Sequence, residues 1–199
     1  MLSGRPYILS TLLLCVALLA GCGGPKEMLV PVRGPVPEDI DLSGEWRMQG
    51  DAAAMEQSLN EAIRRTDGVD ERELVRSILG RGSSSRRNRE IGGLVHVFLE
   101  NAQRLRITQT DAGLFIAFDR SVVEEYRFGE ARMVSKGGAV AQRISGWDGT
   151  TYVIETLDDE GMKLTERYTV DADALSREIV LRSKELEEVQ LTQSFRRAN

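Results

Sequence analysis

The sequence predicts a mainly β protein: an antiparallel up-and-down barrel or strongly curled sheet, with a helical insert after the first strand. Short runs of alternating apolar and polar residues recur at near-even spacing after residue 103, and such alternation is typical of half-buried antiparallel strands. Turn signals such as Asp148-Gly149 separate the runs, as in β-hairpins. All five prolines lie in the first 37 residues, so none interrupts the hydrogen-bond ladders of the predicted sheet.

Residues 1–21 are predicted to be a secretory signal peptide. Arg5 supplies a positive charge before an apolar run over residues 7–20. This run is shorter than the ~20 residues that a bilayer-spanning helix needs. The alternative is an uncleaved membrane helix at the amino terminus. Cys15 lies inside the run and is expected to leave with the signal.

The signal ends in Leu19-Ala20-Gly21-Cys22, which resembles the lipobox of bacterial lipoproteins. The resemblance implies cleavage between Gly21 and Cys22, a thioether-linked diacylglycerol on Cys22, and a further acyl chain such as palmitate on the new amino group. Two or more acyl chains hold a protein stably at a membrane. Gly23 follows the cysteine instead of Asp, which by the same resemblance favours the outer over the inner membrane. The expected location is the bacterial cell envelope, with the domain facing the periplasm.

Composition argues against several classes of function. The net charge is −5, whereas general nucleic-acid binding depends on Lys and Arg that neutralise phosphates. Once the signal is removed, Cys22 is the only cysteine, so we expect no internal disulfide, thiol catalysis or cysteine-based zinc site. His96 is the only histidine, and one histidine does not make a metal site. The sequence predicts neither a metal nor a cofactor.

Residues 22–40 are predicted to be a tether that begins at the lipidated cysteine. They contain four of the five prolines, and proline favours the extended polyproline II conformation. At ~3.1 Å per residue such a tether spans roughly 55 Å. Residues 41–199 then form a single domain.

Residues 51–103 are predicted to be a mostly helical insert within this domain. Met55, Leu59 and Ile63 recur every four residues, as on one face of a helix. Acidic residues 70–71 open a second predicted helix. Apolar residues over 94–102 predict a third helix, although part of this stretch also fits a strand.

A basic stretch separates the second and third predicted helices. It would suit contact with anionic lipid headgroups or lipopolysaccharide, and the alternative is a solvated loop. Its arginines are Arg81, Arg86, Arg87 and Arg89.

Nine strands are predicted after the insert, in addition to an early one around Trp46. A flat sheet of this size would leave bare edges, which closing or strongly curling the sheet removes. The nine predicted strands cover residues 104–109, 114–119, 122–128, 131–135, 140–147, 151–157, 162–170, 176–182 and 189–196.

The first strand contains Gly44-Glu45-Trp46, which resembles the Gly-x-Trp motif of the lipocalin and wider calycin group. The resemblance implies that Trp46 closes one end of a barrel and that a last-strand arginine, Arg196 or Arg197, packs over it. A guanidinium over an indole ring contributes ~0.5–2 kcal/mol, depending on burial. The helical insert and the lack of a helix after the last strand depart from the group's pattern. The group shares its barrel and not its pocket, so no ligand-binding residue is carried over.

The predicted function is a non-catalytic ligand-binding or interaction module, anchored to the membrane through Cys22. Large inward side chains predict a filled or narrow interior, with a small apolar ligand or an envelope protein as the partner. Glu166 lies on the apolar side of its strand beside Tyr168. We expect it to pair internally with an arginine or a tyrosine hydroxyl, or to reach solvent at the mouth of the barrel, although an inward acid could also bind a ligand or act as a general base. The alternatives are a structural subunit that uses the helical insert and, resting on Glu166 alone, an enzyme.

Overall fold

The structure is a computed structural model that describes residues 27–66, 98–119, 122–136, 139–159, 161–182 and 188–198, with the side chains of 63–66 left out. The predicted signal, Cys22, the second predicted helix, the arginines between 81 and 89, and His96 lie outside the described residues.

Ten antiparallel strands form one sheet in the order β4-β3-β2-β1-β10-β9-β8-β7-β6-β5. Strands that are neighbours in sequence pair with each other, except β4 with β5, and β1 also pairs with β10, so the topology is an up-and-down meander joined through its first and last strands. The strands are β1 (Gly44–Met48), β2 (Arg104–Gln109), β3 (Gly113–Phe118), β4 (Val122–Arg127), β5 (Ala131–Lys136), β6 (Ala139–Asp148), β7 (Thr151–Asp158), β8 (Lys163–Asp171), β9 (Ala174–Arg182) and β10 (Val189–Arg197).

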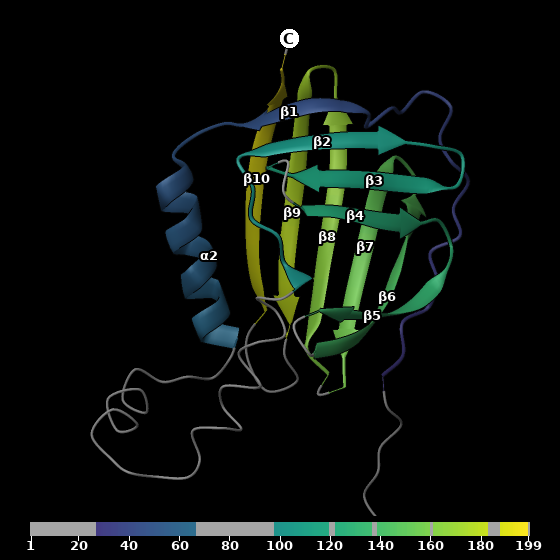
Figure 1. Cartoon of the computed structure of the whole chain (residues 1–199), viewed down its shortest axis with the longest axis vertical. Helices are drawn as coiled ribbons and strands as arrows, with labels where there is room; N and C mark the ends of the chain where they lie inside the picture. Colours follow the sequence, from purple (N-terminus) through teal and green to yellow (C-terminus); the bar gives the residue numbers. More distant parts are fainter. Residues whose placement is uncertain are drawn as a thin grey trace, which may run out of the picture.

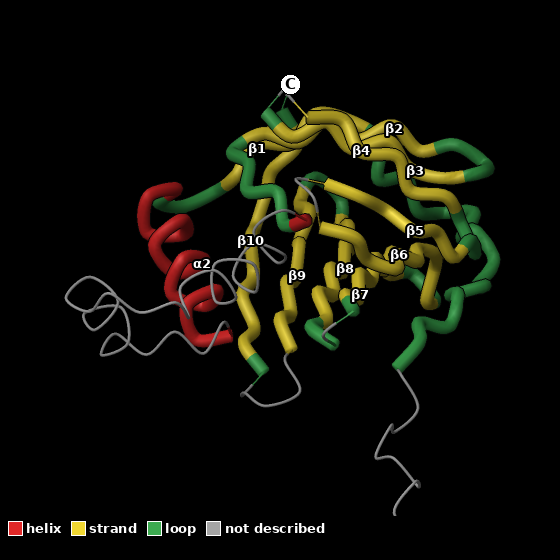
Figure 2. The backbone as a smooth tube through the Cα atoms, turned by 60° about the horizontal axis from the view of Figure 1, so that its bottom comes forward, coloured by secondary structure: helices red, strands yellow, loops and turns green. Residues whose placement is uncertain are grey.

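The sheet curls so strongly that it folds back over itself. β1 to β4 run crosswise over β7 to β10 (Figure 1), and the second view shows the two layers with the core between them (Figure 2). Alternate side chains point into this core, among them Trp46, Leu105, Tyr168 and Phe195, each at most 1% exposed. The predicted fold class is thus confirmed in its strongly curled form.

The sheet remains open between its two edge strands, β4 and β5. Side chains bridge this open side in place of a hydrogen-bond ladder. Glu124 on β4 forms ion pairs with Lys136 on β5 and Arg143 on β6. The Ser145 hydroxyl donates a hydrogen bond to the Arg127 carbonyl oxygen over 2.9 Å.

Helix α2 (Ala52–Thr66) follows the first strand, as predicted for the start of the insert. Asp51 caps it, because its Oδ1 accepts hydrogen bonds from the amides of Ala53 and Ala54 at 2.9 and 3.3 Å. Leu59 and Ala62 are buried and pack in one apolar cluster with residues of β9. No helix in the described ranges is long and apolar enough to cross a lipid bilayer.

The third predicted helix does not extend through Ala102, because residues 99–103 are not helical. Long-range contacts replace the helical ladder here. The Glu100 carbonyl oxygen accepts a hydrogen bond from Arg177 at 2.8 Å, and the Gln103 carbonyl oxygen accepts one from the Met48 amide at 2.8 Å. The described apolar residues of this stretch, Phe98, Leu99 and Ala102, are buried, and residues 94–97 lie outside the described residues.

Part of the segment predicted as a tether packs against the sheet. Leu29 is 5% exposed and lies in a cluster with Ile144. The Leu29 amide donates a hydrogen bond to Gln142 Oε1 over 2.9 Å, and Gly34 forms an isolated antiparallel bridge with Trp147. The chain is therefore attached to the outer face of β6 from Leu29 onward.

Candidate functional site

Trp46 on the first strand is buried and lies opposite Arg197 on the last strand. The Arg197 guanidinium lies 4.2 Å from the centre of the Trp46 ring system and donates a hydrogen bond to the Ser43 carbonyl oxygen over 2.6 Å. Trp46 Nε1 donates to the Leu42 carbonyl oxygen over 3.0 Å. Arg196, its neighbour in β10, is exposed. Of the two arginines that the sequence analysis named, Arg197 is the one placed over the indole.

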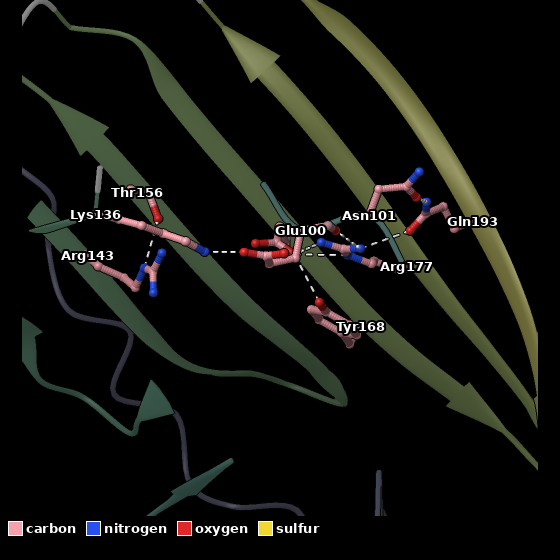
Figure 3. Close-up of polar contacts among 9 residues, drawn as sticks. Glu100, Asn101, Lys136, Arg143, Thr156, Tyr168, Arg177 and Gln193 are labelled. Carbon is pink, nitrogen blue, oxygen red and sulfur yellow. Dashed lines mark hydrogen bonds and ion pairs between the residues drawn. The ribbon is translucent and has the colours of Figure 1, made fainter. Parts of the chain in front are cut away.

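A buried polar cluster is centred on Glu166, and its members Tyr168, Arg177 and Gln193 are labelled in Figure 3. Glu166 is 2% exposed, and its Oε2 accepts three hydrogen bonds. The Tyr168 hydroxyl donates one over 2.9 Å, and Arg177 donates two, from Nε over 2.9 Å and from Nη2 over 2.6 Å. Antiparallel pairing of β8 with β9 places Tyr168 directly opposite Arg177. Glu166 therefore has the internal arginine and tyrosine partners that the sequence analysis expected.

Arg177 is fully buried and links this cluster to two other parts of the chain. Its Nη1 donates hydrogen bonds to Gln193 Oε1 over 3.0 Å and to the Glu100 carbonyl oxygen over 2.8 Å. The guanidinium also lies 5.4 Å from the Phe118 ring centre. Burial alone would lower the pKa of Arg177, but the Glu166 carboxylate outweighs this effect and the pKa is raised. Arg177 is thus a permanent internal cation.

A second polar cluster lies at the open side of the sheet (Figure 3). Lys136 pairs with Glu100 and, over 3.3 Å, with Glu124. Arg143 pairs with Glu124 over 3.0 Å and donates a hydrogen bond to Thr156 Oγ1 over 3.2 Å. Burial lowers the pKa of Lys136, and the two carboxylates raise it by more.

Each of the two clusters contains as many cations as carboxylates. They contain three carboxylates, each with at least one cationic partner. The six groups are Glu100, Glu124, Glu166, Lys136, Arg143 and Arg177. Among the described residues, no three His, Cys, Asp or Glu side chains are grouped as a metal site would need. The interior described here therefore presents paired charges and no unpaired acid or base.

Two buried donors stand apart from this network. Trp147 Nε1 and the Tyr152 hydroxyl have no hydrogen-bond partner in the described part of the chain. The two residues face each other across β6 and β7, with ring centres 5.3 Å apart and the rings in a T-shaped arrangement. Phe128, which follows β4, contacts both rings.

The state of the Tyr152 hydroxyl follows from its surroundings. Burial raises its pKa, and an interaction with the Ser145 hydroxyl, which does not meet the distance and angle limits of a hydrogen bond, offsets only part of this rise. Ser145 itself donates to the Arg127 carbonyl oxygen. Tyr152 therefore keeps its proton at neutral pH and remains a hydrogen-bond donor.

The sequence analysis named Glu166 and Tyr168 but missed Arg177 and the Trp147–Tyr152 pair. Arg177 could have been found, because it alternates with Ile179 on the apolar side of its strand. The unsatisfied donors leave no trace in a sequence, since buried Trp and Tyr usually find partners. Cys22 and the arginines between 81 and 89 lie outside the described residues.

No protein-family model matches this sequence, and no curated protein matches it. Solved structures similar to the chain include a secretory abundant heat soluble protein from Ramazzottius varieornatus, with 10% identity, a TM-score of 0.46, and coverage of 79% of this chain and 95% of the other. Another is apo lipid binding protein 8 from Caenorhabditis elegans, with 9% sequence identity and a TM-score of 0.46. The match covers 80% of this chain and 99% of that protein. A luciferase domain from Lingulodinium polyedrum has 12% sequence identity and a TM-score of 0.49, and the match covers 87% of this chain and 46% of the luciferase chain. With identities and TM-scores this low, what these proteins bind or catalyse does not transfer to this chain.

Proposed function

We propose that the chain is a membrane-anchored lipoprotein of the bacterial envelope whose half-barrel is a non-catalytic binding module for a small, mostly apolar ligand. The observation that carries this proposal is the pair of unsatisfied donors, Trp147 Nε1 and Tyr152 OH. Buried polar groups in native proteins are nearly always hydrogen-bonded, and leaving one unsatisfied costs about 1–3 kcal/mol. A ligand oxygen that accepts from both donors removes this cost.

The ligand chemistry follows from the surroundings of the two donors. Both donors are uncharged, and the cations of the interior are already paired with carboxylates of the chain. An anionic ligand would bring an unpaired charge into an apolar site, which is strongly unfavourable. The site therefore fits a neutral acceptor, such as a carbonyl, ether or hydroxyl oxygen, on an otherwise apolar molecule.

Access to the donors is provided by the open side of the sheet. Phe128 lies in the connection between the two edge strands, is half-buried, and touches both Trp147 and Tyr152. Among the described residues no hydrogen-bond ladder joins β4 to β5, so the two edges can separate by breaking the contacts of Glu124 and Ser145 and a backbone hydrogen bond from Gly129 to Ser145. The ligand would reach the interior past Phe128.

The non-catalytic part of the proposal rests on Glu166. A general base must reach a substrate proton and have a free lone pair. Glu166 is 2% exposed and accepts three hydrogen bonds from the chain. Because the side chain is buried and its carboxylate is held by Arg177 and Tyr168, a substrate proton could reach it only if the core opened.

The anchoring part rests on the Leu19-Ala20-Gly21-Cys22 motif. We expect a mature chain that begins at the acylated Cys22 and faces the periplasm, at the outer rather than the inner membrane. Labelled palmitate should enter the wild-type chain and not a Cys22→Ser variant. Equal labelling of the two would refute this modification.

Native mass spectrometry of the gently extracted full chain tests the binding part. We expect a small-molecule adduct whose occupancy falls severalfold in Tyr152→Phe and further in Tyr152→Phe combined with Trp147→Phe. Phe115→Leu, which removes an aromatic ring that is 40% exposed, is the matched control and should leave occupancy unchanged. If no adduct appears on the wild-type chain, water satisfies the two donors and the ligand proposal fails.

A further inference from the structure

Three arginines lie side by side on the outer face of the sheet. In the register of β1 with β2, Arg47 is opposite Arg104, and in the register of β1 with β10 it is opposite Arg196. All three are exposed. Directly opposite residues in antiparallel strands have Cβ atoms about 4.5–5.5 Å apart, and like charges at that spacing are destabilising. We call these three residues the arginine row.

The arginine row lacks the compensation that other arginines of the outer face have. Arg106 pairs with Glu45 over 2.7 Å, and Arg167 pairs with Glu178 over 3.3 Å. None of the three side chains of the row has an ion pair or a hydrogen bond within the described part of the chain. An uncompensated row is unexpected in a chain with a net charge of −5.

The surface beside the arginine row is hollowed. Two open grooves of about 480 and 460 Å³ both have Arg47 and Arg104 in their walls. These volumes fall within the ~300–1,000 Å³ typical of small-molecule sites. The larger groove continues over Ala117 and Val123, and Val123 is 66% exposed. One groove thus joins a cationic wall to an apolar one.

The acidic residues of the two grooves are already engaged. Glu45 in the larger groove is paired with Arg106. Asp119 in the smaller groove accepts hydrogen bonds from the amides of Gln103 and Arg104 at 3.1 and 2.8 Å. Arg47 and Arg104 therefore line both grooves without an ion-pair partner among the described residues.

We propose that the arginine row and the larger groove form a binding site for an anionic amphiphile. The phosphate or carboxylate head lies on the guanidinium groups, which match such oxyanions with paired hydrogen bonds. A short apolar tail lies over Ala117 and Val123. The site is on the opposite face of the sheet from Trp147 and Tyr152, and it depends neither on the interior ligand nor on the lipid anchor.

The test is isothermal titration calorimetry of the full chain, in non-ionic detergent, with hexyl phosphate and hexanoate. We expect at least one of the two to bind about tenfold or more tightly than inorganic phosphate, acetate or hexanol, because only the amphiphile uses both walls. The tighter of the two identifies the headgroup. Arg47→Gln should weaken binding about five- to tenfold, from the ~1 kcal/mol that one basic residue contributes near an anionic group.

Arg167→Gln is the matched control, because it removes an exposed strand arginine that is already paired. It should bind the probes like the wild type, as should Tyr152→Phe. A second readout is the thermal midpoint of the ligand-free protein, which should be unchanged or higher in Arg47→Gln because like-charge repulsion is relieved.

Three results would overturn this site. The first is that neither amphiphile binds the wild-type chain. The second is that inorganic phosphate binds as tightly as hexyl phosphate, and the third is that Arg47→Gln lowers the thermal midpoint and leaves binding intact.

Discussion

Glu166 and Arg177 hold each other in place at the centre of the core. Their side chains are 3% and 0% exposed, so each depends on the other to offset its loss of water. The Tyr168 hydroxyl and the Gln193 amide complete their hydrogen bonds. Removing one member of such a pair leaves an uncompensated charge, whereas removing both leaves a void that apolar side chains can fill.

Arg177→Met should therefore destabilise the fold by about 3–5 kcal/mol, the range found when one partner of a buried ion pair is lost. The double variant Glu166→Leu with Arg177→Met should recover a large part of that loss. Chemical unfolding of both variants, with Arg167→Met as an exposed control, gives the comparison. A double variant less stable than Arg177→Met alone would contradict the role we assign to the pair.

The tyrosines provide a pH test at the same scale. Burial raises the pKa of Tyr126, Tyr152 and Tyr168, and the chain has four tyrosines. An unfolded chain loses its tyrosine protons at the ordinary pKa of about 10, whereas the folded chain keeps them to higher pH. The stability that these tyrosines contribute is therefore fully present below about pH 10 and is lost as the pH rises toward the folded-state pKa values. Ultraviolet titration of the folded chain should show at most one tyrosine ionising near pH 10. Ionisation of three or four there, with the fold intact, would contradict this burial.

Some of these side-chain contacts could be predicted from the sequence. Glu166 stood out because an acid on an apolar face needs an explanation, and the structure supplies its arginine. The arginine row could not be foreseen, because Arg47, Arg104 and Arg196 are far apart in sequence and only the strand register brings them together.

At the scale of elements, the open side between β4 and β5 depends on Glu124. This residue pairs with Lys136 and Arg143 across the gap, whereas its neighbour Glu125 makes exposed pairs with Arg127 and Arg132. Exposed pairs contribute about 0–1 kcal/mol. We therefore expect Glu124, and not Glu125, to stabilise the open side between β4 and β5.

Glu124→Gln should loosen the two edge strands and destabilise the fold by about 1–3 kcal/mol, because the buried Arg143 loses its charged partner. Hydrogen exchange should become faster in β4 and β5 and stay unchanged in β8 and β9. Glu125→Gln is the matched control and should differ little from the wild type. Equal exchange rates in the two variants would show that the gap is held by other contacts.

The elements themselves follow closely from the sequence. No bound of the nine predicted strands is off by more than two residues, because alternation and turn residues are local signals. Residues 99–102 of the third predicted helix are not helical, because tertiary contacts hold this stretch, including the hydrogen bond from Arg177 to the Glu100 carbonyl oxygen; residues 94–97 of that prediction lie outside the described residues. Helical periodicity does not report such long-range partners.

At the scale of the whole molecule, the domain and its proposed anchor are close together. The sequence alone suggested a tether of roughly 55 Å from its length in polyproline II. Since the chain packs onto the sheet from Leu29, only residues 23–28 separate Cys22 from the fold, and six residues reach at most about 20–22 Å. An anchored domain would therefore stay near the membrane surface.

Leu29 and Val30 test this arrangement as a matched pair. Leu29 is 5% exposed and Val30 is 80% exposed, so only Leu29→Ala should release the segment from the sheet. We expect limited proteolysis within residues 27–36 to become severalfold faster in Leu29→Ala, while the domain stays folded. Val30→Ala should be cleaved like the wild type, and equal cleavage of all three would place the attachment elsewhere.

The most direct test of the proposed function is the native mass of the full chain, extracted gently from the membranes of bacteria that express it. The account expects a polypeptide that begins at an acylated Cys22 and carries a small molecule that Tyr152→Phe releases. A chain that starts at Met1, with neither acyl groups nor a bound molecule, would contradict it.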